Sequence, residues 1–303
     1  MDEVLAPALL VALALVALAW PLAGPLRTRW RRARLARVPF PHEWRRILRQ
    51  RVPLVRRLPA DLRLQLHGLV QRFVAEVPFI GCAGQAVDDE VRVTIAAQAC
   101  LLLLNRGGSF EGLREVLVYP GAFAVSRVHT SEGGVRHEGR GVLAGESHGR
   151  GAVVLSWQDV VDGAADPGDG HNVVIHEFAH RLDQDHGAAN GAPWLGPGRS
   201  AGGYDEWARV LGAEYAALRA RVAAAEEGAE ARARERGGGA AGPREGDSAA
   251  IGVLPAYGAT DPAEFFAVVS EVFFERPSEL QRHHAPLYAQ LRRVYRTDPA
   301  TWQ

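Results

Sequence analysis

The sequence predicts an α+β protein in which a mostly helical domain with a small sheet follows an N-terminal transmembrane helix. An uncharged, apolar stretch runs from Val4 to Leu26. Apolar residues in several later segments recur at steps of three and four, which is typical of amphipathic helices. Between residues 115 and 157, short apolar runs bounded by glycine and proline are typical of strands.

The composition fits a folded domain and excludes several classes of protein. The chain has 303 residues, is 47% hydrophobic and has a formal net charge of zero, so it can bury a full core. All its positive charge is arginine, and no basic excess marks a general nucleic-acid binder. Two cysteines, Cys82 and Cys100, are too few for a disulfide framework and fit a reducing compartment.

The first segment is predicted to anchor the protein in a membrane. Val4 to Leu26 is long enough to span a hydrocarbon core of about 30 Å as a helix. A cleavable signal peptide is the alternative, but it needs positive charge before the apolar run, where this chain has Asp2 and Glu3. Arginines crowd residues 27–37, and by the positive-inside rule they place the rest of the chain in the cytoplasm.

This predicts a single-pass protein of the inner, cytoplasmic membrane in two parts. Residues 1–37 form the anchor with its basic flank, and residues 38–303 form the main domain, which faces the cytoplasm. Val38 to Pro59 is a connector interrupted by prolines. Ala60 to Val77 and Asp88 to Leu104 follow as amphipathic helices.

Three apolar runs then predict the strands of the small sheet, at 116–119, 123–128 and 152–157. The third run directly precedes the segment with the chemical motif. We expect it to form the upper edge of a cleft, where a substrate peptide could add as an extra strand.

The motif is His176-Glu177-Phe178-Ala179-His180, in an apolar segment that predicts a helix. Residues four apart lie on the same helix face, so both imidazoles can reach one zinc ion. Glu177 would lie near a water activated by that metal, where a carboxylate can take its proton and pass it to a leaving amine. This arrangement is typical of metallopeptidases.

Helices account for most of the remaining chain. Asp205 to Arg236 predicts a long helix, and residues 223–250 are poor in bulky apolar side chains, which predicts a flexible insertion. Asp261 and Pro262 predict the start of a helix that runs through Phe273. Residues 286–296 predict a last helix.

Two residues compete to be the third metal ligand. His186 would extend the motif to a pattern in which a glycine and a methionine turn are also needed, but Asp183 replaces the glycine and the only methionine is Met1. Glu264, on the helix that starts at Asp261, is the favoured candidate.

Three further residues have open roles. Tyr257 precedes Glu264 and could donate a hydrogen bond to the oxyanion that forms during hydrolysis, or it could be a core tyrosine. Asp183 could hold an imidazole or cap the helix end. Glu271 could form a salt bridge or support a metal ligand from behind. The other histidines are predicted to lie in a loop or on the surface: His129, His137, His148, His171, His283 and His284.

The two motifs together resemble a known family. The segment from His176 to Asp183 and the segment from Tyr257 to Ala267 are similar to those of the Mlc titration factor A family of zinc-dependent peptidases. A similar spacing occurs in the catalytic domain of anthrax lethal factor. The resemblance implies a zincin-like fold, Zn²⁺ held by His176, His180 and Glu264, Glu177 as base and Tyr257 as transition-state donor.

The resemblance also implies a cytoplasmic bacterial protein with peptidase or aminopeptidase activity, whose members in some cases bind a glucose-responsive transcriptional repressor. This chain departs from the family in its apolar N-terminus and in a longer insertion before Ile251. Two functions are therefore expected. One is a membrane-anchored zinc peptidase acting on a peptide or protein. The other is a non-catalytic binding protein that sequesters a repressor and has a structural or vestigial zinc site.

Overall fold

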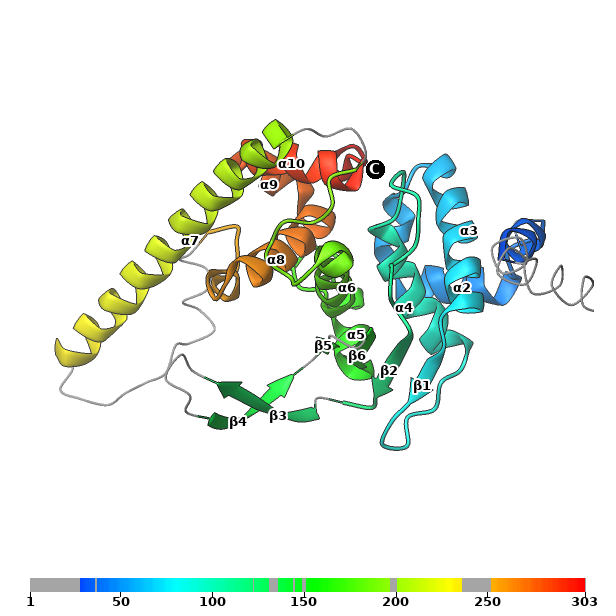
Figure 1. Cartoon of the computed structure of the whole chain (residues 1–303), viewed down its shortest axis with the longest axis horizontal. Helices are drawn as coiled ribbons and strands as arrows, with labels where there is room; N and C mark the ends of the chain where they lie inside the picture. Colours follow the sequence, from blue (N-terminus) through cyan, green and yellow to red (C-terminus); the bar gives the residue numbers. More distant parts are fainter. Residues whose placement is uncertain are drawn as a thin grey trace, which may run out of the picture. The chain divides into compact units, whose positions relative to one another are not determined.

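The computed structural model describes residues 28–35, 37–121, 123–130, 136–143, 145–148, 151–196, 201–235 and 252–302. Contacts between Cα atoms divide the chain into two compact units, Met1–Pro41 and His42–Gln303. In the first unit, residues 28–35 are helical. The elements labelled in Figure 1 belong to the second unit, which contains the predicted metal site.

The predicted localisation in the membrane is not supported by the structure. In the part of the chain that is described, no helix is both long enough and apolar enough to cross a bilayer. The 35-residue helix α7 (Ala201–Glu235) has the length, but arginine and glutamate recur along it, and charged side chains are costly in hydrocarbon. Residues 4–26, on which the single-pass anchor and its cytoplasmic orientation were predicted, lie outside the described residues.

A small sheet with four described strands lies beside the helices, in the order β1-β2-β6-β5. The first three strands are parallel, and β5 pairs antiparallel with β6. A separate antiparallel pair is formed by β3 and β4. The strand bounds are β1 (Phe79–Gly81), β2 (Glu115–Tyr119), β3 (Phe123–Thr130), β4 (Arg136–Leu143), β5 (Gly145–His148) and β6 (Ala152–Ser156).

This topology corrects one expectation about the cleft. The strand predicted at 152–157 is β6, and it is paired on both sides, by β2 and by β5. It therefore has no open edge to offer a peptide. The edge of the described sheet on that side is β5, which contacts the helix of the motif.

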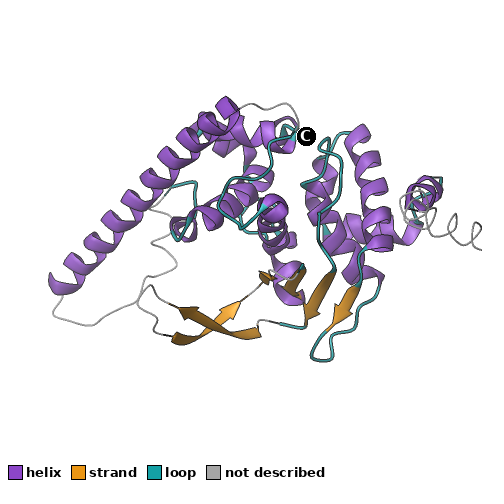
Figure 2. Ribbon diagram, viewed as in Figure 1, coloured by secondary structure: helices purple, strands orange, loops and turns teal. Residues whose placement is uncertain are grey.

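Helices make up most of the second unit and lie above the strands in the view of Figure 2, so the predicted α+β class is confirmed. Their bounds are α2 (His42–Arg51), η1 (Pro53–Arg57), α3 (Ala60–Glu76), α4 (Asp89–Leu101), α5 (Trp157–Ala165), α6 (Val173–Asp183), η2 (Gln184–His186), η4 (Ala256–Ala259), α8 (Pro262–Glu275), α9 (Pro277–His283), α10 (Ala285–Tyr295) and η5 (Pro299–Thr301). The segment before Pro59, expected to be a connector, contains α2 and η1.

The motif helix α6 lies in the interior and contacts α4, α5 and α8. Its Phe178 is fully buried, and the Phe178 ring centroid lies 4.7 Å from that of Phe110 and 5.7 Å from that of Phe73. On the other side α8 is buried from Phe265 to Glu275. Because both helices are held by the core, the side chains between them have fixed positions.

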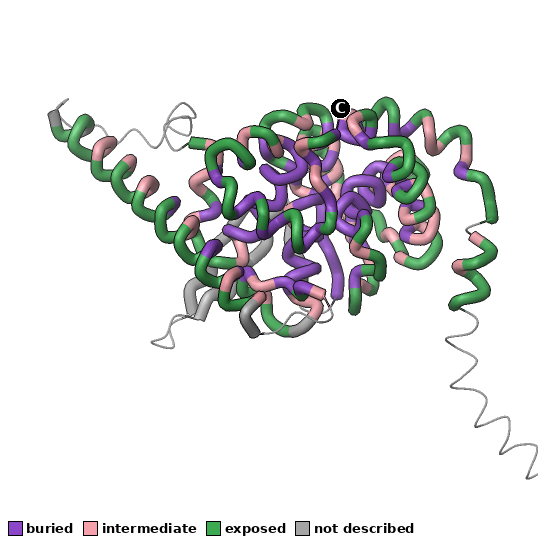
Figure 3. The backbone as a smooth tube through the Cα atoms, turned by 90° about the horizontal axis from the view of Figure 1, so that it is seen from above, coloured by how far each residue is buried: buried purple, intermediate pink, exposed green. Residues whose placement is uncertain are grey.

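The long helix α7 behaves differently along its length. Its first half contributes Trp207, Val210, Leu211 and Leu218 to the core, whereas beyond Leu218 its described residues are exposed or half-buried (Figure 3). Residues 223–235 continue this helix, so the predicted flexible insertion at 223–250 begins as a helix. Its remainder lies outside the described residues.

Candidate metal centre

The helix α6 begins at an asparagine cap. Asn172 Oδ1 accepts a hydrogen bond from the backbone N–H of Ile175 at 3.0 Å, which satisfies one of the free donors of the first turn. Residues Val173 to Ile175 are β-branched and have modest helix propensity. Val174 and Ile175 are fully buried, so packing stabilises this turn and places His176 in the second turn.

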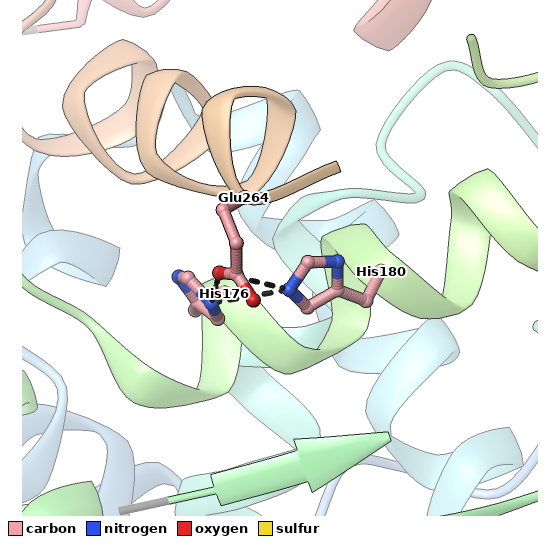
Figure 4. A group of neighbouring side chains, drawn as sticks. All are labelled: His176, His180 and Glu264. Carbon is pink, nitrogen blue, oxygen red and sulfur yellow. Dashed lines mark hydrogen bonds and ion pairs between the residues drawn. The ribbon is translucent and has the colours of Figure 1, made fainter. Parts of the chain in front are cut away.

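Two histidines of α6 and one glutamate of α8 converge on a single point. The Nε2 atoms of His176 and His180 lie 3.2 Å apart. Oε2 of Glu264 lies 3.0 Å from Nε2 of His176 and 3.4 Å from Nε2 of His180 (Figure 4). Among the described side chains, this is the group of three or more potential ligands that could hold one metal ion.

The three donor atoms fit a zinc ion. A tetrahedral site with bonds of about 2.0–2.1 Å places its ligand atoms roughly 3.3 Å apart. The three distances here, 3.0, 3.2 and 3.4 Å, form a nearly regular triangle of that size. Two imidazole nitrogens and one carboxylate oxygen are also a typical donor set for catalytic zinc, in which the fourth position takes water or substrate.

The electrostatics of the cluster follow from its geometry. Burial opposes ionisation, yet hydrogen bonds with His176 and His180 hold the pKa of Glu264 well below its ordinary value. Burial also opposes protonation of His176, but Glu264 and Glu271 raise the pKa of this imidazole well above its ordinary value. The site therefore stabilises positive charge between its carboxylates.

Glu271 orients His176 from the opposite side of the ring. Its Oε1 lies 2.8 Å from Nδ1 of His176, and its Oε2 accepts the backbone N–H of Asn172 at 2.5 Å. A carboxylate that accepts a hydrogen bond from Nδ1–H holds the proton on that nitrogen and leaves the lone pair of Nε2 free to bind a metal. Of the two roles predicted for Glu271, the structure favours support of the imidazole from behind.

Asn172 connects this contact to the core, and the sequence patterns did not single it out. Its Nδ2 donates to Oε1 of Gln98 at 2.8 Å and to Oε1 of Glu275 at 3.0 Å. An asparagine directly before an apolar helical run is a typical cap, so its position could have been found. Gln98 and Glu275 are distant in sequence from α6, and nothing in their own segments marks them.

The side-chain carboxyl of Glu275 has no cationic partner among its described contacts, although its backbone oxygen accepts a hydrogen bond from Arg57. Burial, together with the negative charges of Asp169 and Glu271, raises the pKa of Glu275 to about 8, against the opposing hydrogen bond from Asn172. Burial therefore favours the protonated, neutral form of Glu275 behind the metal site.

Glu177 and Tyr257 both lie near His176. Glu177 is buried in α6, and its charge contributes to the raised pKa of His176. Tyr257 lies in η4, its ring centroid is 6.0 Å from that of His176, and 51% of the residue is exposed. The alternative that Tyr257 is a core tyrosine is therefore wrong.

Asp183 anchors the loop that follows the motif helix. Its Oδ2 accepts the backbone N–H groups of Asn190 at 2.8 Å and Gly191 at 2.7 Å. The described hydrogen bonds of Asp183 are thus with the loop and not with an imidazole. Burial raises the pKa of Asp183, and the backbone hydrogen bonds oppose that rise.

Among the described side chains, no further histidine joins the cluster. The side chain of His186 lies outside the described side chains, as do those of His129, His137 and His148. His171 and His283 are exposed, as predicted. The prediction for His284 is wrong: it is 8% exposed, and its Nδ1 lies 2.8 Å from Oε2 of Glu214 on α7.

Comparisons with known proteins point to the same chemistry. A family model described as glucose-regulated metallo-peptidase M90 matches residues 27–296. An uncharacterised protein of Synechocystis is 38% identical over 272 residues, which cover 89% of each chain. Mlc titration factor A of Salmonella agona is 32% identical over 251 residues, covering 82% of this chain and 84% of its own, and that of Salmonella gallinarum matches equally.

The family model covers most of the chain, and the relatives confirm the resemblance to Mlc titration factor A that the two motifs predicted. A metallopeptidase family implies a metal, and the His176, His180 and Glu264 cluster has the donor atoms to hold one. The chain belongs to the glucose-regulated metallopeptidase M90 family.

Proposed function

We propose that this protein is a zinc-dependent peptidase with a zincin-like domain, in which His176, His180 and Glu264 hold the metal. The proposal is carried by the triangle of donor atoms with sides of 3.0, 3.2 and 3.4 Å. A zinc ion bound there supplies a Lewis acid that polarises the scissile carbonyl and lowers the pKa of a water.

The side chains around the cluster supply the remaining chemistry. Glu177 takes a proton from the attacking water and gives it to the leaving amine, a contribution of about 10²–10⁴ in rate. The hydroxyl of Tyr257 donates to the carbonyl oxygen as negative charge develops on it. Glu271 keeps the imidazole of His176 turned with Nε2 towards the metal.

The open edge of the described sheet supports a peptide substrate. Strand β5 contacts α6 and pairs with β6 on one side only within that sheet. An extended peptide that adds to this edge is bound through its main chain, which gives tolerance of side-chain sequence. The family resemblance implies peptidase or aminopeptidase activity, and the positions cleaved in a peptide with a free or an acetylated N-terminus distinguish exopeptidase from endopeptidase activity.

Metal content and peptide hydrolysis of the full chain and of its Glu264→Ala variant test the proposal. Removing one of three ligands is expected to abolish both zinc retention and hydrolysis. Glu279→Ala, on the surface of α9, is the matched control and is expected to keep both. Zinc retained by Glu264→Ala would contradict this ligand set and favour His186 as third ligand.

A second candidate is a non-catalytic regulatory protein that sequesters a transcriptional repressor around a structural or vestigial zinc site. The observation in its favour is the name of the Salmonella relatives, which describes a factor that titrates Mlc. Glu177→Gln separates the two functions. A sequestering protein keeps both its partner and its cellular effect in this variant, whereas a peptidase loses its effect together with hydrolysis.

A further inference from the structure

One cavity of the His42–Gln303 unit is lined mainly by basic residues. It has a volume of about 690 Å³ and lies between α2, η1 and α3. Four arginines line it, Arg45, Arg49, Arg56 and Arg63, and none of its lining residues is acidic. Its volume is within the range of about 300–1,000 Å³ that is typical of small-molecule sites.

The spacing of these residues brings like charges together. Arg45 and Arg49 are four residues apart on α2, so they lie on one helix face. Like charges at this spacing destabilise a helix. Burial and the charges of Arg45 on α2 and Arg63 on α3 lower the pKa of His67, which also lines the cavity.

The four guanidinium groups have no carboxylate partner among the described residues. Arg56 and Arg63 instead donate to main-chain carbonyl oxygens, of Arg49 at 2.7 Å and of Leu58 at 2.9 Å. Each of these bonds uses one N–H group and holds the guanidinium group of its arginine in position. The positive charge of the cavity is thus both uncompensated and partly preorganised.

Other arginines of α2, outside the cavity, do have carboxylate partners. Arg46 pairs with Glu43 at 2.6 Å, and Arg51 of α2 pairs with Glu90 at 2.5 Å. The arginines of α2 that line the cavity are therefore distinguished from their neighbours by the absence of such pairs within the described structure.

Apolar side chains form the floor of the cavity. Leu48 is 2% exposed and Val55 is 5% exposed, and both are lining residues. Guanidinium groups above an apolar floor suit a ligand that has an anionic and an apolar part. Several converging guanidinium groups favour a doubly charged phosphate, which arginine binds in a bidentate manner, over a single carboxylate.

We propose that this cavity binds a small phosphorylated organic molecule, with its phosphate held by Arg45, Arg49, Arg56 and Arg63 and its apolar part against Leu48 and Val55. The site is separate from the metal cluster in its residues and does not depend on peptidase activity.

Isothermal titration of the zinc-loaded full chain with pyrophosphate, at constant ionic strength, tests the site. The Arg45→Gln/Arg49→Gln variant removes two charges and leaves the anchoring bonds of Arg56 and Arg63 intact. Affinity is expected to fall by at least about tenfold, since each charge-assisted hydrogen bond contributes more than that factor. Arg46→Gln, on the same helix, removes a paired arginine and is expected to keep the wild-type affinity.

Four results would overturn the proposal. One is a wild-type protein that binds pyrophosphate no better than sulfate, and another is equal affinity in the double variant. The third is binding that is lost in Glu264→Ala but kept in the double variant, because it would place the anion at the metal cluster. The fourth is binding of a polyglutamate peptide in preference to pyrophosphate, because it would identify the ligand of the cavity as an acidic protein segment and not a phosphorylated molecule.

Discussion

The orientation of one imidazole depends on a carboxylate outside the metal cluster. His176 lies between Glu264, at Nε2, and Glu271, at Nδ1. Glu271 is itself held by the backbone N–H of Asn172, whose side chain caps the same helix. Asn172, which caps the start of α6, therefore also helps to orient the imidazole of His176, the first histidine of that helix.

Glu271→Gln is expected to weaken zinc binding by about 10–100-fold, the usual effect of removing the carboxylate behind a histidine ligand. The amide has no negative charge to polarise the imidazole, and it meets the Asn172 N–H with a donor or a neutral acceptor. Competition with a chromogenic chelator measures the affinity. Glu279→Gln changes a half-buried carboxylate on α9 that pairs with Arg276, and it is the control. Equal affinities of Glu271→Gln and wild type would show that Glu271 has no effect on the metal.

Tyr257→Phe is expected to lower kcat by about 10²–10³ at unchanged zinc content, because it removes a donor to the developing oxyanion. The ring remains beside His176, so KM is expected to change little. Steady-state kinetics on a fluorogenic peptide, with metal content measured in parallel, check this. A variant with wild-type kcat would exclude Tyr257 from the reaction.

At the scale of elements, α6, α7 and α8 meet at one glycine. Gly191 donates its N–H to Asp183 at the end of α6, and its carbonyl accepts the indole N–H of Trp207 on α7 at 2.8 Å. Its φ is 77°, and a Cβ there would lie 2.4 Å from the carbonyl oxygen of Pro262 at the start of α8. The loop after the motif therefore requires a residue without a side chain.

Gly191→Ala is expected to destabilise the protein by more than about 1 kcal/mol, through the unfavourable positive φ and the contact with a backbone oxygen. Gly68→Ala is the matched control, because Gly68 lies within α3 and its added Cβ would meet nothing within 4 Å. This change is expected to stabilise the helix by about 0.5–1 kcal/mol. Denaturant unfolding measures both, and equal stabilities of the two variants would contradict the role of Gly191.

At the scale of the whole molecule, one buried acid makes stability depend on pH. The native pKa of Glu275 is about 8, against 4.5 in the unfolded chain. As pH rises from about 4.5 to about 8, the unfolded state loses this proton while the native state keeps it, so stability falls over that interval. Above pH 8 the effect is constant.

Glu275→Gln replaces the protonated acid by a neutral group of the same shape. Relative to wild type, the variant is expected to gain stability progressively over the same pH interval. Unfolding free energies measured by denaturant at several pH values check this. A difference between the two proteins that does not change with pH would show that Glu275 does not titrate as its surroundings indicate.

The parts predictable from sequence are those that depend on local patterns. The helical spacing of His176 and His180, and Asp261 with Pro262 at the start of α8, predict elements that the structure contains. Asp261 accepts the N–H groups of Ala263 and Glu264, so a local cap positions the proposed third ligand.

The parts that could not be predicted depend on pairing between distant segments. The three-residue β1 is too short to have a pattern, and the position of β6 inside the sheet follows from β5, whose glycine-rich segment has no apolar alternation. The partners of Asn172 come from α4 and α8. The prediction of a surface position for His284 is wrong because the acidic partner of this residue, Glu214, lies on α7, far away in the sequence.

Peptide hydrolysis by the Glu177→Gln variant, compared with wild type at equal zinc content, is the most direct test of a peptidase built on this cluster. The amide cannot take the proton of the attacking water, so the rate is expected to fall by about 10²–10⁴ while zinc remains bound. Hydrolysis by the zinc-loaded variant at the wild-type rate would contradict the proposed chemistry of the α6 motif.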